Sequence, residues 1–147
     1  MQILIYSKWK MRCIVIFFDT NVLVYASTDQ DKEKMIFSQQ LIAKAIENHT
    51  FFISALVLSE YIFILSKLKI IDEQSEKVRL FSTLAKGSYD VDTVIHGYNL
   101  CQKVNFCKNI NDVIHLKVAE AYCQRLVTFD TDFKKLQKYT KLEIKIL

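Results

Sequence analysis

Residues 13–25 read CIVIFFDTNVLVY, an unbroken apolar run that stops at Asp19-Thr20-Asn21. A short apolar run rich in β-branched and aromatic residues is typical of a strand buried on both faces of a parallel sheet. In open parallel α/β sheets, functional groups gather where strands end and loops lead into helices. Asp19 therefore has the position of a functional carboxylate. It is also well placed to be a helix N-cap, a role that suits Asp, Thr and Asn alike.

The composition is that of one folded domain. A chain of 147 residues can bury a sizeable core, and 51% hydrophobic with 24% charged residues excludes an intrinsically disordered chain. The lack of proline and the presence of only two glycines argue against proline-rich linkers and glycine-rich phosphate loops. A net charge of +4 is compatible with a polyanionic partner but does not require one.

The first residues and the cysteines carry no processing or metal-binding signal. The apolar block at residues 1–6 is far shorter than the roughly 20 residues of a membrane span. Its positive charges follow it, so a signal peptide is not expected. We treat residues 1–10 as an N-terminal extension and residues 11–147 as the domain.

No C-x-x-C pair occurs, which favours reduced thiols in a cytoplasmic protein. The cysteines are Cys13, Cys101, Cys107 and Cys123.

Hydrophobic periods of 3.6 and 2.0 residues alternate along the chain and predict an α/β fold with a central, mainly parallel sheet. Helices are expected on both faces of this sheet. The strands, about five, are expected at residues 14–18, 50–54, 88–91, 125–129 and 142–147. The helices are expected at residues 32–47, 55–68, 73–86, 93–104 and 109–121, with Asp72 and Asp92 as N-caps and Gly87 as a helix end. The helix at 55–68 is apolar almost all round, which predicts that it is buried.

Three further carboxylates stand near other strand ends and helix starts. Glu60 lies inside an apolar helix, where a carboxylate is costly unless it is paired, binds a metal or faces solvent. Asp112 lies in the first turn of a helix, where the helix dipole also favours a negative charge. Asp130 directly follows another short strand, and Asp132 comes two residues later. Together with Asp19, these acids can converge on the carboxyl edge of one parallel sheet.

Carboxylates gathered in one place raise one another's pKa values, and a divalent cation relieves that repulsion. Oxygen ligands without His or Cys suit Mg²⁺ or Mn²⁺ rather than zinc. A hard cation in an acidic pocket is suited to attack on a phosphodiester, because it orients the phosphate, generates hydroxide and stabilises the leaving oxygen. The sequence therefore predicts that Asp19, Glu60, Asp112 and Asp130 are catalytic residues that bind Mg²⁺ or Mn²⁺.

Four motifs that contain these acids resemble PIN-domain ribonucleases, and more narrowly VapC-type toxins of type II toxin–antitoxin pairs. The first runs from the first strand through residues 19–25, and the others cover residues 53–60, 111–119 and 126–133. The resemblance extends over residues 13–147, and four motifs in this order and at this spacing are fairly specific.

The resemblance implies that the four acids form the acidic quartet of the family's active site. It further implies that Asn21 holds the site by hydrogen bonding, that Thr128 places a hydroxyl near it, and that Asp132 assists as an outer ligand. The third motif departs from the family pattern, since Ile114 and His115 stand where a small residue is common. His115 lies one helical turn from the third acid and can face the groove, although a core or surface position is the default for such a histidine.

The expected reaction is in-line attack of metal-activated water on phosphorus, which in this family leaves a 3′-hydroxyl and a 5′-phosphate. RNA has to enter a narrow acidic pocket as a single strand or an exposed loop. Basic residues are expected to border the pocket and hold flanking phosphates, although each can equally belong to a solvated surface. The candidates are Lys117, Arg125, Lys134 and Lys135. The resemblance also implies a homodimer and a cognate antitoxin whose tail covers the groove.

Two other functions stay open. A phosphatase of the haloacid dehalogenase type also starts from a strand that ends in aspartate, but it needs a second acid two residues later, where this chain has Asn21. A catalytically silent PIN-like module would bind RNA or a partner without cutting. The complete set of acids argues against such a module, because a degenerate scaffold has no need for mutually repelling carboxylates.

Overall fold

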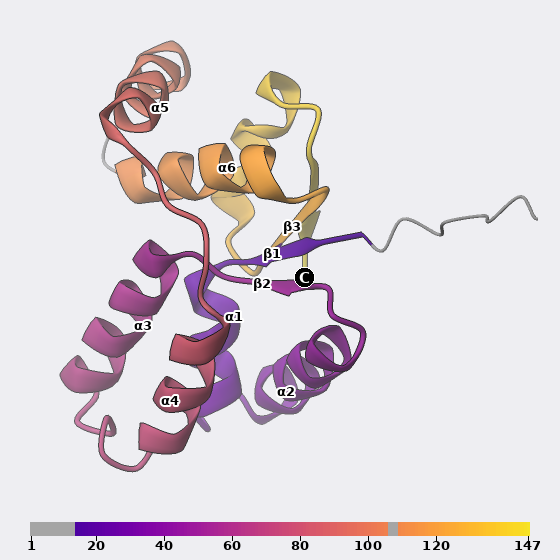
Figure 1. Ribbon diagram of the computed structural model, residues 1–147, viewed down its shortest axis with the longest axis vertical. Helices are drawn as coiled ribbons and strands as arrows, with labels where there is room; N and C mark the ends of the chain where they lie inside the picture. Colours follow the sequence, from indigo (N-terminus) through magenta and orange to yellow (C-terminus); the bar gives the residue numbers. More distant parts are fainter. Residues whose placement is uncertain (1–13, 106–108) are drawn as a thin grey trace, which may run out of the picture.

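The computed structural model describes residues 14–105 and 109–147 and confirms the α/β fold class (Figure 1). In this part of the chain the sheet has four strands, all parallel, in the order β2-β1-β3-β4. They are β1 (Ile16–Phe18), β2 (Phe51–Phe52), β3 (Arg125–Thr128) and β4 (Glu143–Ile146). The chain extends from β1 to β2 on one side and places β3 on the other. The order therefore reverses between β1 and β3, the position at which open α/β sheets form a crevice.

Helices cover both faces of the sheet, as the sequence predicts. Figure 1 shows α5 and α6 on one side and α1 to α4 on the other. The α-helices are α1 (Thr20–Ser27), α2 (Lys32–Glu47), α3 (Ala55–Lys67), α4 (Ser75–Leu84), α5 (Val91–Val104) and α6 (Ile110–Tyr122). Two 3₁₀ helices, η2 (Thr131–Lys135) and η3 (Gln137–Tyr139), connect β3 to β4.

Alternation along β1 explains why its sequence is apolar throughout. The Phe17 ring lies against the ring of His115 in α6, with centroids 5.6 Å apart. The Phe18 ring packs on the opposite face against Phe51 (4.8 Å), which in turn stacks on Phe81 of α4. Phe17 and Phe18 are both fully buried, so each side of this central strand is covered by a different helix layer.

The strand expected at residues 88–91 is wrong, and so is the cap expected at Asp92. Residues 88–90 do not form a strand with any part of the chain that the structure describes, and Asp90 is the N-cap of α5, with its carboxylate accepting a hydrogen bond from the backbone N–H of Thr93 (2.9 Å). Asp92 falls in the first turn of that helix. Local capping by Asp90 therefore outweighs the weak strand pattern around it.

The bounds of α4 also differ from the prediction. The helix begins at Ser75, so Asp72 does not cap it, and it ends at Leu84, before Gly87. Gly87 lies in the following loop with φ +79°, and an added Cβ there would come within 2.7 Å of the Phe52 ring. The glycine is thus needed for close packing of the loop on the sheet.

The buried side of α3 is narrower than its sequence predicts. Val57, Tyr61 and Leu65 are fully buried, but Phe63 is 61% exposed. The helix buries one face completely, while Leu56 and Leu58 beside that face pack against the core only in part.

Cys101 and Cys123 are both buried, and burial raises the pKa of Cys123 to about 12. Cys13, Cys107 and the expected extension at residues 1–10 lie outside the described residues. Of the helices in the described ranges, none is long and apolar enough to cross a membrane.

Candidate active site

Asp19 lies where β1 passes into α1, beside β3. Its Oδ1 caps α1 by accepting a hydrogen bond from the backbone N–H of Thr20 (2.7 Å), so the capping and the functional position coincide. Its Oδ2 accepts hydrogen bonds from Thr128 Oγ1 (2.6 Å) and Asn21 Nδ2 (2.9 Å). Asp19 is 4% exposed. Burial raises the pKa of Asp19 above its ordinary value, although nearby His115 and these hydrogen bonds oppose the rise.

Asn21 and Thr128 join the ends of β1 and β3. Asn21 Nδ2 donates to Thr128 Oγ1 (3.0 Å), and Asn21 Oδ1 accepts a hydrogen bond from the backbone N–H of Phe129 (3.0 Å). The Thr128 hydroxyl also accepts a hydrogen bond from the backbone N–H of Asp130 (2.9 Å). These contacts fix the Asp19 carboxylate in one orientation and hold the two strand ends together.

Glu60 reaches the same place from α3. Its Oε2 accepts hydrogen bonds from Thr20 Oγ1 (2.5 Å) and His115 Nε2 (2.8 Å), and its Oε1 accepts one from Asn111 Nδ2 (2.8 Å). Burial alone would raise the pKa of Glu60, but the hydrogen bond and charge of His115, with the other donors, leave it below the ordinary value. The carboxylate is therefore paired, which explains how a helix of this composition tolerates it.

Asp112 and Asp130 complete the group. The side chain of Asp112, in the first turn of α6, makes no hydrogen bond or ion pair with any residue that the structure describes. Burial and the charges of Asp19, Asp130 and Glu60 raise the pKa of Asp112 to about 7, against the opposing effect of His115. Asp130 follows β3, and its Oδ1 accepts a hydrogen bond from the backbone N–H of Asp132 (2.8 Å).

One cavity of about 540 Å³ contains all four predicted acids, which come from four separate segments of the chain. Its lining combines carboxylates with apolar and aromatic side chains. The lining residues are Asp19, Thr20, Asn21, Val24, Tyr25, Gln30, Glu60, Phe63, Ile64, Asn111, Asp112 and Asp130. The exposed Phe63 thus stands at the edge of this cavity, which we call the acidic cavity.

The carboxylate, amide and hydroxyl oxygens that line the acidic cavity are the types of ligand that a hard divalent cation prefers. Among residues 14–105 and 109–147, no three His, Cys, Asp or Glu side chains are gathered tightly enough to form a ready-made metal cage. Mg²⁺ does not need one, because it keeps several waters and takes only one or two protein carboxylates directly. The pKa of Asp112 is raised by burial and by the charges of its acidic neighbours, and a cation bound beside it would relieve that repulsion.

Asp132, Lys134 and Lys135 lie in η2, which begins directly after Asp130. None of the three lines the acidic cavity. Lys134 is exposed, and Lys135 Nζ lies 3.5 Å from the Asp132 carboxylate. These residues are therefore neighbours of the cavity through Asp130 and are not part of its wall.

Lys117 and Arg125 lie away from the acidic cavity. Lys117 pairs with Glu120 (3.2 Å) further along α6 and lines a different hollow. Arg125 Nε pairs with Glu143 Oε2 (2.8 Å) at the start of β3, the opposite edge of the sheet from the acids.

Several residues of this site were not predicted. Thr20 directly follows Asp19 and Asn111 directly precedes Asp112, and this adjacency is the sequence signal that could have identified them.

No sequence signal identifies Lys34 of α2 as a neighbour of the site. Its Nζ lies 4.7 Å from the ring centroid of Tyr25, which lines the acidic cavity. His115, for which a core or surface position was the default, is buried and contacts Glu60.

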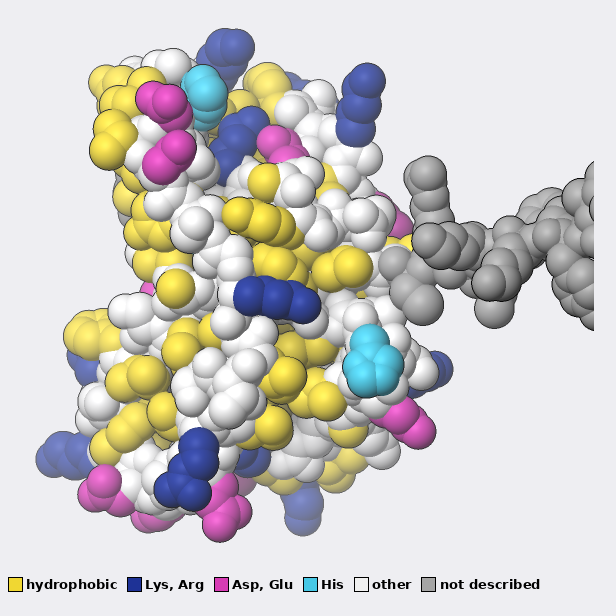
Figure 2. All heavy atoms as spheres, in the orientation of Figure 1, with side chains coloured by type: hydrophobic (Ala, Val, Ile, Leu, Met, Phe, Trp, Pro, Cys, Tyr) yellow, Lys and Arg dark blue, Asp and Glu magenta, His cyan; other side chains and the backbone are white. Residues whose placement is uncertain are grey.

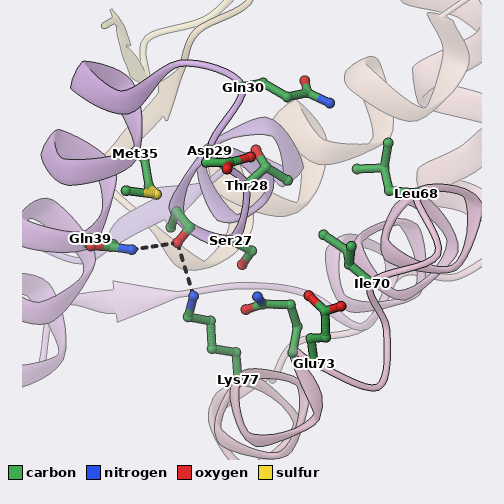
Figure 3. A pocket seen from close by; sticks show the side chains of 12 residues that line it. Ser27, Thr28, Asp29, Gln30, Met35, Gln39, Leu68, Ile70, Glu73 and Lys77 are labelled. Carbon is green, nitrogen blue, oxygen red and sulfur yellow. Dashed lines mark hydrogen bonds between the residues drawn. The ribbon is translucent and has the colours of Figure 1, made fainter.

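A second cavity, of about 400 Å³, lies at the other end of α1 and shares Gln30 with the acidic cavity (Figure 3). Gln39 Nε2 (2.9 Å) and Lys77 Nζ (3.1 Å) both donate to the carbonyl of Ala26. Burial lowers the pKa of Lys77. Two carboxylates also line this cavity, those of Asp29 and Glu73.

The acidic cavity lies at the carboxyl edge of the sheet, where the strand order reverses, which is the usual place of the functional site in open α/β domains. The chain belongs to the PIN domain family, whose model matches residues 16–139 and thus every residue of the acidic cavity. PIN domains are generally nucleases and typically use divalent metals.

Among solved structures, the fold is similar to one chain in the crystal structure of VapBC2 from Rickettsia felis bound to a DNA fragment from their promoter. The TM-score is 0.66, and the match covers 91% of this chain and 99% of that chain. The two sequences are 19% identical, so this likeness establishes a shared fold. No curated protein sequence matches the chain.

Proposed function

We propose that this PIN domain is a divalent-metal-dependent endoribonuclease and acts as the toxin of a toxin–antitoxin pair. The observation that carries the proposal is the meeting of Asp19, Glu60, Asp112 and Asp130 in one cavity, with the pKa of Asp112 raised to about 7. Burial of a carboxylate beside other carboxylates costs stability, and perturbed carboxylates in a cleft are typical of functional sites.

Asp19, Asp112 and Asp130, together with Glu60, would hold Mg²⁺ or Mn²⁺. A cation bound there supplies charge neutralisation, orientation of the phosphate and activation of water. Asp112 has both oxygens available, whereas Asp19 is already held by Thr128 and Asn21. In the proposed hydrolysis, the water oxygen bonds to phosphorus as the bond to the 3′ oxygen breaks, which leaves a 3′-hydroxyl and a 5′-phosphate.

The aromatic residues that line the cavity support the proposal that the substrate is single-stranded. Tyr25 and Phe63 line it, and Phe63 is 61% exposed, so unpaired bases have faces on which to stack. Lys34, whose Nζ lies near the Tyr25 ring, and Lys134 and Lys135, which follow Asp130 in η2, are proposed to hold flanking phosphates. Asp132, next to Lys135, is proposed to adjust that local charge rather than to bind the metal itself.

We also propose that the chain forms a homodimer and binds a cognate antitoxin in the cytoplasm. The similar structure from Rickettsia felis is described as VapBC2 bound to promoter DNA, which supports a partner of this kind. Figure 2 shows hydrophobic side chains gathered along the outer side of α5, where Val91 (76%), Ile95 (50%) and Tyr98 (50%) are exposed at helical spacing. An apolar stripe of this kind is suited to protein contact.

The phosphatase alternative is disfavoured by the contacts of Asn21. That chemistry needs an acid at this position, but both polar ends of the Asn21 side chain are used to join β1 and β3. The residue therefore supports Asp19 and offers no proton to a leaving group.

The decisive experiment is cleavage of tRNA, rRNA and mRNA fragments with Mg²⁺ or Mn²⁺, with and without EDTA. Asp112→Asn keeps the shape of the side chain and removes its charge, and we expect it to abolish cutting. Asp92→Asn is the matched control, because Asp92 is an exposed aspartate in the first turn of the neighbouring helix α5. RNA binding by the wild-type chain without cleavage in either metal would overturn the proposal and favour a silent binding module.

A further inference from the structure

His115 is a buried polar residue that the proposed reaction does not use. Its side chain is 1% exposed and packs on Phe17, and its Nδ1 has no hydrogen-bond partner in the described part of the chain. A buried polar atom without a partner costs free energy, and an aliphatic side chain would avoid that cost. Packing alone therefore does not account for an imidazole at this position.

The other ring nitrogen supplies a reason. His115 Nε2 lies 2.8 Å from Glu60 Oε2 and 4.0 Å from Asp19 Oδ1. Because the Glu60 carboxylate is ionised and can only accept, Nε2 carries the hydrogen and donates it. This donation does not depend on the charge of the ring, since the Nε2–H is present in the matching neutral tautomer and in the imidazolium alike.

Three donors hold the Glu60 carboxylate, but they differ in rigidity. Asn111 is exposed, and Thr20 itself lines the acidic cavity. His115 is enclosed between β1 and the body of α6, so its ring cannot move away. A glutamate side chain has several rotatable bonds and would otherwise sample orientations toward solvent.

We propose that His115 is a positioning residue whose Nε2–H fixes the Glu60 carboxylate toward Asp19, so that α3 and α6 present their acids to one metal. The inference rests on the proposed nuclease function and adds a residue to it. It assigns His115 no contact with metal or RNA. Its action is entirely through Glu60.

The test compares His115→Gln with His115→Asn and His115→Leu in the full chain. The Gln amide nitrogen reaches about as far as imidazole Nε2 and is neutral at every pH, whereas the Asn amide is one methylene shorter. Mn²⁺ binding is measured by electron paramagnetic resonance on metal alone, and cleavage is measured on single-stranded RNA. We expect Leu and Asn to weaken Mn²⁺ binding and kcat about 10–100-fold with KM for RNA unchanged. Gln should stay within about threefold of wild type, because it restores the donor.

Val118→Ala is the control for a purely structural effect, because Val118 is buried in the same helix without contacting Glu60. It should lower the thermal midpoint and leave Mn²⁺ affinity unchanged. If His115→Leu fails to fold, the contrast between Gln and Asn decides. Equal effects of Gln and Asn, or wild-type Mn²⁺ affinity in His115→Leu, overturn the inference while the nuclease assignment stands. A wild-type chain that neither binds Mn²⁺ nor cuts RNA overturns both.

Discussion

The two ends of α1 face two different cavities: four carboxylates line the first, whereas a lysine accompanies two carboxylates in the second. At the N-terminal end, Asp19 caps the helix inside the acidic cavity. At the C-terminal end, Lys77 donates to the carbonyl of Ala26 in the second cavity. The helix dipole favours negative charge at the first end and positive charge at the second, so each arrangement suits its place.

The presence of carboxylates does not distinguish the two cavities, since Asp29 and Glu73 line the second one. The difference is mutual influence: in the acidic cavity the charges of three neighbouring acids contribute to raising the pKa of Asp112. Carboxylates that oppose one another's ionisation are typical of functional sites, and we therefore place the proposed function in the acidic cavity.

The largest expected effect is the loss of cleavage when one coupled acid is neutralised. Asp19→Asn keeps the cap on α1 but removes the charge, and we expect RNA cleavage to fall at least about 100-fold, since metal-assisted charge stabilisation is worth several kcal/mol. Glu73→Gln makes the same kind of change in the second cavity and should leave the rate unchanged. Equal losses in single-turnover assays would show that the two cavities do not differ in function.

The second prediction concerns metal-free stability against pH. The pKa of Asp112 is about 7 in the folded chain and near 3.8 when unfolded, so the folded state binds more protons between these values. Stability attributable to Asp112 is therefore lost as the pH rises from about 4 to about 7, by on the order of 1–3 kcal/mol after allowing for partial exposure. Denaturant unfolding in EDTA should show this loss in wild type relative to Asp112→Asn. Parallel curves for the two proteins would contradict the coupling.

The third prediction tests the hydrogen bonds that hold Asp19. Thr128→Val preserves shape but leaves the Asp19 carboxylate and the backbone N–H of Asp130 each short of a partner. We expect unfolding free energy to fall by about 1–3 kcal/mol. The same substitution at Thr83, whose hydroxyl contacts a carbonyl on the exposed side of α4, should cost less than about 0.5 kcal/mol. If Thr128→Val lowers the unfolding free energy no more than Thr83→Val does, the Thr128 hydroxyl does not help to hold Asp19 in place.

The acids that follow strands were the easiest part of the site to predict. In a parallel sheet the carboxyl ends of all strands lie at one edge, so Asp19 and Asp130 could be assigned to the same edge, and the pairing of β1 with β3 then makes them neighbours. The same rule places Arg125 at the opposite edge of the sheet from the acids, because Arg125 begins the strand that Asp130 follows.

The partners of Glu60 could not be predicted, because they depend on how α3 is rotated against α6. Asn111 and His115 lie one turn apart on α6 and meet Glu60 only through that packing. The missing fifth strand has a local cause instead. The pattern at residues 88–91 was compatible with a strand, but Asp90 as a cap commits the chain to α5.

The smallest expected effect is at the C-terminal end of α1. Lys77→Met removes one hydrogen bond to Ala26, but that carbonyl keeps the one from Gln39, and a half-buried ammonium no longer has to be desolvated. The two changes oppose each other, so unfolding free energy at pH 7 should shift by less than about 1 kcal/mol, with cleavage unchanged.

Burial lowers the pKa of Lys77, so the unfolded chain binds more protons than the folded chain in the alkaline range. The wild type should therefore gain stability relative to Lys77→Met as the pH rises toward 10. Loss of RNA cleavage in Lys77→Met, with folding intact by circular dichroism, would make the second cavity part of the active site and erase the distinction between the two ends of the helix.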